Sequence, residues 1–482
     1  MTEFTPQFPG GLPVGAGWVD TGRTTPVTFP YDGTPVFDAP LGTPDQARAA
    51  VDHAVSVAPV VAGLPSRVRR DVLLGARDAV AARRADFENL LVLETGKPLR
   101  DCRVEVDRTL VTLAASAEEV SRLHGETVPL DLLPAGDGML GFWVRRPIGV
   151  VVGIAGFNYP LLLATHKVGP AVAAGCPVIV KPAPQTPLAT LWLVHLLREA
   201  ASAAGASPAL VQLVTGAADV GAALVTDPRV GAVSFTGSAA VGHRIARDAA
   251  PRKVLLELGS NTALYVAADA DVDAAVDAVI RGGFYASGQA CISVQRVLVD
   301  RAVVAEFLPW LAAGVGDVVV GDPRDERTQV SALIDKKSAA RVEEWIAAAE
   351  AAGARRYATA SGQVAPAPTV LIDVPDSAAV WDEEVFGPVV CVRTVDGLDE
   401  AFDLVNASRY GLHASVFTSS LAIAMRALER LEVGGVVVND VPGFRSDTMP
   451  YGGVKDSGIG REGPRFAAEE FTVTRMAIIR PM

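Results

Sequence analysis

The stretch Gly149-Val-Val-Val-Gly-Ile-Ala-Gly-Phe-Asn-Tyr-Pro160 opens the part of the chain that decides the fold. Its first half is an apolar run of strand length, and an apolar segment of helix length, Leu161 to Ala174, follows it. The next apolar run, Pro177 to Val180, again has the length of a strand. Neither run alternates polar with apolar residues, so both strands are expected to be covered on both faces, as strands of a parallel sheet are.

This alternation of strand and helix continues to residue 256. Further strands are expected at 210–214, 232–235 and 253–256, and further helices at 186–204, 218–225 and 238–248. The order predicts an α/β fold with a parallel sheet of Rossmann type. A second α/β unit, about residues 261–457, is expected to begin with a strand at 262–266 and to contain a helix at 271–282 and strands at 294–299 and 389–392.

The chain before residue 149 has a different pattern. Residues 1 to about 40 are rich in Pro, Gly and Thr and predict an irregular or short-stranded segment, and helices are expected at about 43–62, 66–95 and 99–123. The segment Glu94-Thr-Gly-Lys-Pro98 is interpreted as a simple turn between two helices, because Gly ends one helix and Pro starts the next. Residues 126–146 predict a β-hairpin.

Length, charge and apolar runs limit the class of protein. A chain of 482 residues is expected to form two or three domains. The net charge of -12 argues against nucleic-acid binding, which needs a basic face. The start, Met1-Thr-Glu-Phe-Thr-Pro6, lacks the regions of a signal peptide. The most apolar stretch, Ile148 to Val180, is interrupted by prolines and polar residues, so no membrane span is expected.

Cysteine and histidine spacing argues against a metal or disulfide framework. The four cysteines lie far apart without paired spacing: Cys102, Cys176, Cys291 and Cys391. They match neither a zinc site nor a set of disulfides, so the reducing cytoplasm is the expected location. The six histidines also lack the spacing of metal ligands, and no metal is expected.

Three residues supply the groups that acyl transfer needs. Cys291 lies in Gly283-Phe-Tyr-Ala-Ser-Gly-Gln-Ala-Cys-Ile-Ser-Val-Gln-Arg296, at a turn of small residues; taken alone, it predicts only a small buried hydrophobe. Glu257 interrupts the apolar run in Val254-Leu-Leu-Glu-Leu-Gly-Ser-Asn261, and Asn158 follows the strand that ends at Ile154. A thiol, a carboxylate and an amide can act as nucleophile, base for water and oxyanion donor.

The order and spacing of Phe157-Asn-Tyr-Pro160, Glu257-Leu-Gly-Ser260 and Gly288-Gln-Ala-Cys291 resemble the NAD(P)-dependent aldehyde dehydrogenase superfamily, from about Ala49 to the C-terminus. The resemblance implies that Cys291 attacks the aldehyde and that Asn158 and the Cys291 N–H hold the oxyanion. Hydride transfer would leave a thioester, and Glu257 would activate the water that hydrolyses it to the acid. Lys167 matches a lysine position of the family, for a proton relay or the nicotinamide ribose; the alternative is a solvated helix lysine.

A dinucleotide is expected at the carboxyl ends of the parallel strands. One strand ends on Lys181, and another is followed by Phe235-Thr-Gly-Ser-Ala-Ala-Val-Gly242, which opens a helix. The resemblance implies six cofactor residues: Lys181, Gly237, Ser238, Gly242, Glu384 and Phe386. Many NAD-preferring relatives place Glu three residues after the lysine, where this chain has Pro184. Without that carboxylate there is no repulsion of a 2′-phosphate, so the expected cofactor is NAD or NADP.

The substrate is less constrained than the reaction. The resemblance implies a pocket lined by Tyr159, Leu162, Leu163, His166, Ala290, Ile292 and Phe444. This mainly apolar set favours an uncharged aromatic or aliphatic aldehyde. Arg108 and Arg445, however, could reach an anion at the mouth, which would suit a small anionic or hydroxy aldehyde of the semialdehyde or lactaldehyde type. Against this alternative, an anion close to the reacting carbon would need a cation beside the thiol, and Ala290 supplies none.

Two further alternatives stay open, an acylating dehydrogenase and a non-catalytic structural relative. The expected cofactor-binding domain comprises residues 1–125 and 147–257, and the expected catalytic domain comprises residues 258–457. Residues 126–146 and 458–482 are assigned to an arm and a C-terminal tail. In the resembled family, such a hairpin and a C-terminal strand, here about 472–479, form an oligomerisation arm. A homodimer or homotetramer is therefore expected, with a small aldehyde, and neither nucleic acid nor membrane, as partner.

Overall fold

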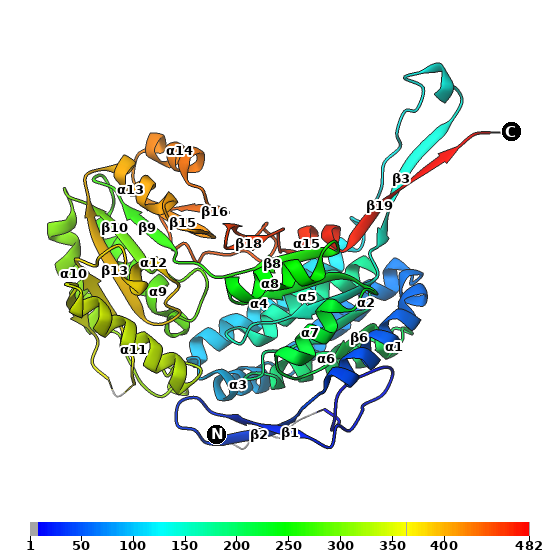
Figure 1. Cartoon of the computed structure of the whole chain (residues 1–482), viewed down its shortest axis with the longest axis horizontal. Helices are drawn as coiled ribbons and strands as arrows, with labels where there is room; N and C mark the ends of the chain where they lie inside the picture. Colours follow the sequence, from blue (N-terminus) through cyan, green and yellow to red (C-terminus); the bar gives the residue numbers. More distant parts are fainter. Residues whose placement is uncertain (1–7, 363, 482) are drawn as a thin grey trace.

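The computed structural model describes residues 8–362 and 364–481, which form two lobes and a projecting arm (Figure 1). The larger lobe contains a six-stranded sheet in the order β18-β8-β7-β4-β5-β6. Its strands are β4 (Val150–Ile154), β5 (Val178–Lys181), β6 (Val211–Leu213), β7 (Val230–Thr236), β8 (Lys253–Glu257) and β18 (Gly458–Ile459). All pairs are parallel except β18 with β8. The predicted parallel sheet is confirmed.

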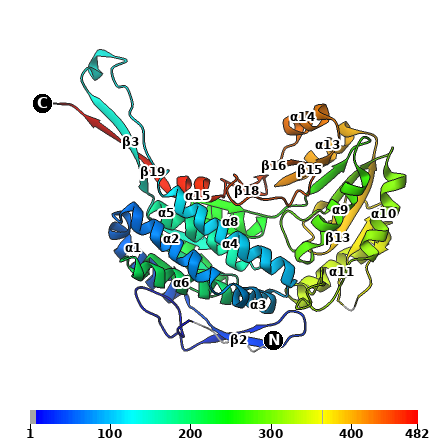
Figure 2. The same ribbon diagram turned by 180° about the vertical axis from the view of Figure 1, so that it is seen from behind.

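Helices cover both faces of this sheet (Figures 1 and 2). They are α1 (Pro44–Ala62), α2 (Ser66–Ala81), α3 (Arg84–Thr95), α4 (Leu99–Glu119), α5 (Pro160–Ala174), α6 (Leu188–Ala203), α7 (Ala218–Thr226), α8 (Ala239–Ala249) and α15 (Pro464–Glu470). The single helix predicted at 66–95 is wrong, because Arg83 leaves the helical region (φ -117, ψ 24). The break lets α3 turn into the core, where Phe87 stacks on Trp192 with ring centroids 4.2 Å apart.

The smaller lobe contains a seven-stranded sheet in the order β11-β12-β13-β10-β9-β15-β16. Its strands are β9 (Ala263–Val266), β10 (Arg296–Asp300), β11 (Arg355–Thr359), β12 (Thr369–Ile372), β13 (Val389–Val395), β15 (His413–Phe417) and β16 (Gly435–Val438). Its helices are α9 (Val272–Phe284), α10 (Val304–Gly316), α11 (Lys336–Ala351), α12 (Ala379–Asp382), α13 (Leu398–Asn406) and α14 (Leu421–Arg430). Two apolar clusters pack around the sheet, and only β11 runs antiparallel to its neighbour.

The arm is a two-stranded ribbon that extends away from both lobes and ends near the C-terminus (Figure 1). It pairs β3 (Leu140–Pro147) with β19 (Thr472–Ile479) in antiparallel register. The hairpin predicted at 126–146 is only partly present, since its first half contributes one isolated bridge, between Thr127 and Phe142. The predicted tail also divides: β18 joins the six-stranded sheet, α15 packs on α5, and only the residues after them reach the arm.

The remaining short strands lie at the edges of the lobes. β1 (Thr24–Thr28) pairs with β2 (Pro35–Pro40), and β14 (Tyr410–Gly411) pairs with β17 (Val454–Lys455). Among the described residues, no helix is long and apolar enough to cross a bilayer.

Candidate active site

A cavity of about 340 Å³ lies where the two lobes meet. It brings together most of the residues singled out in the sequence: Asn158, Tyr159, Leu162, Leu163, His166, Gly237, Ser238, Glu257, Ala290, Cys291, Ile292, Glu384 and Phe386. Arg108 and Arg445 line it as well. Four predicted site residues do not line it: Lys167, Lys181, Gly242 and Phe444.

Cys291 stands at the end of a left-handed turn that follows α9. Ala286, Ser287 and Gly288 have φ values of 48°, 58° and 72°. Gly288 is required there, because an added Cβ would lie 2.2 Å from the Gly387 carbonyl oxygen. The backbone N–H of Ala286 donates to Asp101, and the Ser287 hydroxyl accepts from the Ser331 N–H, so both lobes hold the turn.

The thiol of Cys291 is partly buried and holds its proton at neutral pH. Burial raises the pKa of Cys291 to about 11, although a contact between its Sγ and the Tyr451 hydroxyl, 3.2 Å away, acts in the opposite direction. Burial also raises the pKa of Tyr451 well above its usual value, so the hydroxyl keeps its proton and can donate it to a thiolate. Tyr451 was not singled out from the sequence.

Alkylation of Cys291 by iodoacetamide is expected to accelerate about tenfold per pH unit from about pH 7 to pH 10, because only the thiolate reacts. The rate is measured on cofactor-free protein by the mass of the carbamidomethylated chain. Cys291→Ala is the control, since the other three cysteines are buried. A rate that levels off below about pH 9 would contradict the raised pKa.

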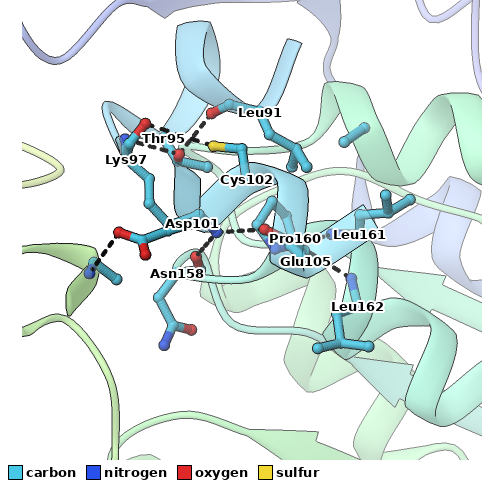
Figure 3. A network of polar contacts seen from close by, with 12 residues as sticks. Leu91, Thr95, Lys97, Asp101, Cys102, Glu105, Asn158, Pro160, Leu161 and Leu162 are labelled. Carbon is cyan, nitrogen blue, oxygen red and sulfur yellow. Dashed lines mark hydrogen bonds and ion pairs between the residues drawn. The ribbon is translucent and has the colours of Figure 1, made fainter. Parts of the chain in front are cut away.

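Asn158 approaches the thiol from the start of α5. Its side-chain Nδ2 donates to the Gln289 carbonyl over 2.8 Å, two residues before Cys291. Its own backbone carbonyl accepts a hydrogen bond from Lys97 Nζ (Figure 3). The amide is thus anchored on its main chain, and its NH₂ group lies against the cysteine turn.

Glu257 ends β8 inside the cavity, and neither of its carboxylate oxygens has a hydrogen-bond partner among the described residues. Burial raises the pKa of Glu257 well above its usual value, and the nearby carboxylate of Glu462 raises it further. An unpartnered carboxyl in a cavity next to a thiol is poised to exchange protons with water.

Lys167 is neither solvated nor in the cavity. Its side chain is fully buried, and its Nζ donates to Thr236 Oγ1 over 2.7 Å and to Glu462 Oε1 over 2.9 Å. Burial alone would raise the pKa of Glu462, but Lys167, His166 and Arg445 outweigh it and hold that pKa well below its usual value. Lys167 therefore keeps Glu462 ionised close to Glu257. Glu462 was not singled out from the sequence.

The carboxyl ends of β5 and β7 have the form of a dinucleotide site. Both strands flank β4, and Ile154 pairs with Lys181 on one side and with Phe235 on the other, so these ends lie about 10 Å apart. Ser238, the N-cap of α8, makes no side-chain cap bond, which leaves the first N–H groups of that helix available to a phosphate. Burial lowers the pKa of Lys181 to about 8, and its Nζ contacts only the Pro182 carbonyl in the described part of the chain.

Two cofactor candidates from the other lobe close the site. Glu384 accepts from the Ser260 N–H over 2.9 Å, and burial raises the pKa of Glu384 to about 7. Phe386 packs edge-on against Phe157, with ring centroids 5.6 Å apart. Gly242 instead permits close packing, since an added Cβ would lie 2.2 Å from the Leu258 side chain. The Lys181 ammonium, the aromatic ring of Phe386 and the uncapped start of α8 are groups that fit a bound dinucleotide.

A group of charged side chains lies at the cavity, formed by Arg108, His166, Arg445 and Asp447. Arg108 makes two hydrogen bonds to Asp447, of 3.0 and 2.7 Å, and His166 Nε2 lies 3.3 Å from the same carboxylate. Arg445 stacks over the Tyr451 ring, with its guanidinium carbon 3.7 Å from the ring centroid. Asp447 was not singled out from the sequence, although it lies two residues after Arg445.

The structure does not bring Phe444 to the cavity. Its side chain is 53% exposed, whereas its neighbours Gly443 and Arg445 line the cavity. The Phe444 N–H donates to the Val441 carbonyl in a tight turn, and consecutive residues of such a turn point in different directions. From this turn, the cavity is therefore lined by the guanidinium of Arg445 and not by the predicted aromatic ring of Phe444.

Fold and cavity together describe an α/β protein of two lobes, with a thiol beside the carboxyl ends of a parallel sheet. The model of the aldehyde dehydrogenase family matches residues 18–477. The 3-sulfolactaldehyde dehydrogenase of Priestia aryabhattai is 40% identical over 481 residues, covering 99% of this chain and all of that protein.

Solved structures agree with this match. Aldehyde dehydrogenase 21 from Physcomitrella patens, in complex with the reaction product succinate, is 34% identical and superposes with a TM-score of 0.93 over 99% of both chains. A glyceraldehyde-3-phosphate dehydrogenase from Methanocaldococcus jannaschii, complexed with NADP, is 33% identical, with a TM-score of 0.91 over 95% of this chain and 100% of that one. The chain therefore belongs to the aldehyde dehydrogenase family, and it is an NAD(P)-dependent aldehyde dehydrogenase.

Proposed function

We propose that this enzyme oxidises a small aldehyde that carries an anionic group close to its carbonyl, and releases the free acid. Cys291 is the nucleophile, Asn158 the oxyanion donor and Glu257 the base for water. The sequence favoured an uncharged aromatic or aliphatic aldehyde and left a small anionic or hydroxy aldehyde as the alternative. We now prefer an anionic aldehyde, for the reason given below.

The proposed reaction begins when Cys291 gives up its thiol proton to solvent. The thiolate sulfur then bonds to the aldehyde carbon, and the carbonyl oxygen becomes an oxyanion. Asn158 Nδ2 and the Cys291 backbone N–H would hold that oxygen; within the described ranges, this N–H donates no other hydrogen bond. The bound dinucleotide supplies the hydride acceptor. Glu257 then takes a proton from the water that attacks the resulting thioester, which releases the acid and restores the thiol.

Arg445 is the observation that carries the proposed substrate class. Its side chain is only 6% exposed and lines the thiol cavity, and its Nε and Nη2 make no hydrogen bond to any described residue. The nearest carboxylate oxygens, of Asp447 and Glu462, lie 3.9 and 3.5 Å away and are shared with other cations. A buried guanidinium with open donors favours an anionic ligand.

This cation meets the objection raised from the sequence. Ala290 supplies no charge beside the thiol. The Arg445 guanidinium, however, lies over the ring of Tyr451, and the hydroxyl of Tyr451 contacts Cys291 Sγ. The names of the three relatives agree with the proposal, since sulfolactaldehyde carries a sulfonate, succinate two carboxylates and glyceraldehyde 3-phosphate a phosphate.

The test crosses NAD and NADP with four aldehydes: 3-sulfolactaldehyde, succinic semialdehyde, lactaldehyde and benzaldehyde. We expect kcat/KM to be at least about tenfold higher for an anionic aldehyde than for either neutral one, because a desolvated charge contact is worth about 2 kcal/mol or more. Cys291→Ala gives the background. Highest kcat/KM with benzaldehyde would overturn the proposed class, and a requirement for coenzyme A would overturn the hydrolytic reaction.

For the cofactor, we propose that NADP is accepted, because position 184 holds an exposed proline and no carboxylate. Pro184→Glu is expected to lower kcat/KM for NADP about tenfold or more while changing that for NAD by less than about threefold, since only NADP carries a 2′-phosphate for the new carboxylate to repel. Pro184→Gln, which adds a similar volume without charge, is the control. Equal loss with NAD and NADP would contradict this assignment.

We also propose that the arm joins copies of this chain and that the two lobes are the cofactor-binding and catalytic domains. Apolar side chains of the arm are exposed, with Leu140 at 50%, Ile478 at 63% and Ile479 at 47%. A second copy that covers them would remove this surface from water.

A further inference from the structure

The segment interpreted from the sequence as a simple turn carries a fully buried cation. Lys97 is 2% exposed, and its ammonium has three partners, of which Figure 3 shows Glu105 and the Asn158 carbonyl. It makes an ion pair with Glu105, donates to the Asn158 backbone carbonyl over 2.9 Å, and lies 3.7 Å from the centroid of the Tyr159 ring. An ammonium has three donors, so Lys97 is satisfied and two of its three contacts fall on consecutive residues of one segment.

Glu105, the partner of Lys97, holds the residues that follow. Its Oε1 accepts from the N–H groups of Leu161 and Leu162, over 2.9 and 3.2 Å, in the first turn of α5 (Figure 3). The N-cap residue of α5, Tyr159, makes no side-chain cap bond, so Glu105 supplies the cap from another helix. The main chain from 158 to 162 is thus held at its carbonyl by Lys97 and at its N–H groups by Glu105.

The opposite side of the site is held from the same helix. Asp101 lies one turn before Glu105 on α4 and accepts from the Ala286 N–H in the cysteine turn. Residues four apart share a helix face. One face of α4 therefore contacts both the segment of Asn158 and the turn that presents Cys291.

We infer that Lys97 and Glu105 are positioning residues of the reaction, because together they fix the Asn158 main chain so that its side-chain amide meets the oxyanion formed at Cys291. This inference rests on the proposed role of Asn158. Neither Lys97 nor Glu105 lines the thiol cavity, so they act through Asn158 and do not touch the substrate. A shift of about 1 Å in a catalytic group can lower the rate about 100-fold. Loss of the contacts that hold the Asn158 main chain is therefore expected to slow the reaction.

The experiment measures acylation of Cys291 by p-nitrophenyl acetate, which needs the thiol and the oxyanion site but no dinucleotide. Lys97→Met is expected to lower the acylation rate about 10- to 100-fold, approaching the loss in Asn158→Ala. Alkylation by iodoacetamide, which forms no oxyanion, is expected to change less than about threefold. The double variant Lys97→Met/Asn158→Ala is expected to be no slower than Asn158→Ala, because a residue that acts through Asn158 has nothing left to position.

Two further variants keep the test decisive. Lys97→Met/Glu105→Gln removes both buried charges, so it avoids the unpaired carboxylate that could unfold the single variant, and the same loss of acylation is expected. Glu88→Gln is the matched control, since Glu88 is a buried carboxylate on the preceding helix that pairs with Arg84 and Arg103 and makes no hydrogen bond to residues 158–162 in the described part of the chain. It is expected to lower the melting temperature while leaving acylation within about twofold of the unaltered chain.

The outcomes separate the inference from the proposed function. Unchanged acylation in Lys97→Met, or losses that multiply in the double variant, would overturn the positioning role. Unchanged acylation in Asn158→Ala would instead overturn the oxyanion role on which it rests. A parallel loss of alkylation and acylation would show that Lys97 supports the thiol turn and not the amide.

Discussion

Glu257→Gln is expected to release one equivalent of reduced cofactor per active site and then almost stop. Glutamine keeps the shape of the side chain, so attack by Cys291 and hydride transfer continue, but it cannot take a proton from water. The thioester on Cys291 then accumulates. Loss of a general base typically costs about 10²- to 10⁴-fold in rate, so the steady-state kcat should fall within that range while the burst keeps its amplitude.

Stopped-flow absorbance of the reduced nicotinamide would measure the burst, and intact mass would show the acylated chain. Hydroxylamine, which cleaves thioesters without a base, should restore turnover, and Cys291→Ala should show no burst. Because burial raises the pKa of Glu257, the base is formed only as pH increases, so the steady-state rate should rise with pH in the unaltered enzyme. That rise should be absent from Glu257→Gln; full turnover in this variant would refute the assignment of the base.

The sequence was sufficient for the parallel sheet and for placing Asn158, Glu257 and Cys291 at strand ends and turns, where the structure brings them to one cavity. Apolar runs such as Val150–Ile154 and Val178–Lys181 are buried on both faces, and this requirement is visible in each run by itself. Asn158, Glu257 and Cys291 interrupt or follow such runs, so their positions at strand ends and turns could be predicted from their neighbours in sequence.

Contacts between distant segments could not be predicted in the same way. Arg445 lies over the ring of Tyr451, and the Tyr451 hydroxyl contacts Cys291 Sγ, 160 residues earlier in the chain. Lys97 was assigned to an ordinary turn because its three partners, Glu105, Asn158 and Tyr159, become neighbours only when α4 packs on α5. Residue types were readable from the sequence, but the directions of these side chains depend on packing.

Arg445→Met is expected to lower kcat/KM for an anionic aldehyde about 10²- to 10³-fold, while kcat/KM for a neutral aldehyde of similar length falls less than about tenfold. A charged contact in a desolvated site is worth about 2–5 kcal/mol, and each 1.4 kcal/mol corresponds to a factor of ten. Succinic semialdehyde and butanal form a suitable pair, because they differ mainly by the carboxylate. Most of the loss for the anionic substrate should appear in KM if the contact is equally strong in the bound and transition states.

The control must remove a charge near Glu257 without touching the substrate, because Arg445 also lowers the pKa of that base. Arg461→Met meets this need: Arg461 acts on Glu257 in the same direction, but it donates to the Gly453 and Gly460 carbonyls and does not line the cavity. In Arg461→Met both aldehydes should therefore slow by the same factor, whereas in Arg445→Met the anionic one should slow far more. If Arg445→Met, like Arg461→Met, slowed the anionic and the neutral aldehyde by the same factor, Arg445 would act only by lowering the pKa of Glu257, and the anion would bind elsewhere.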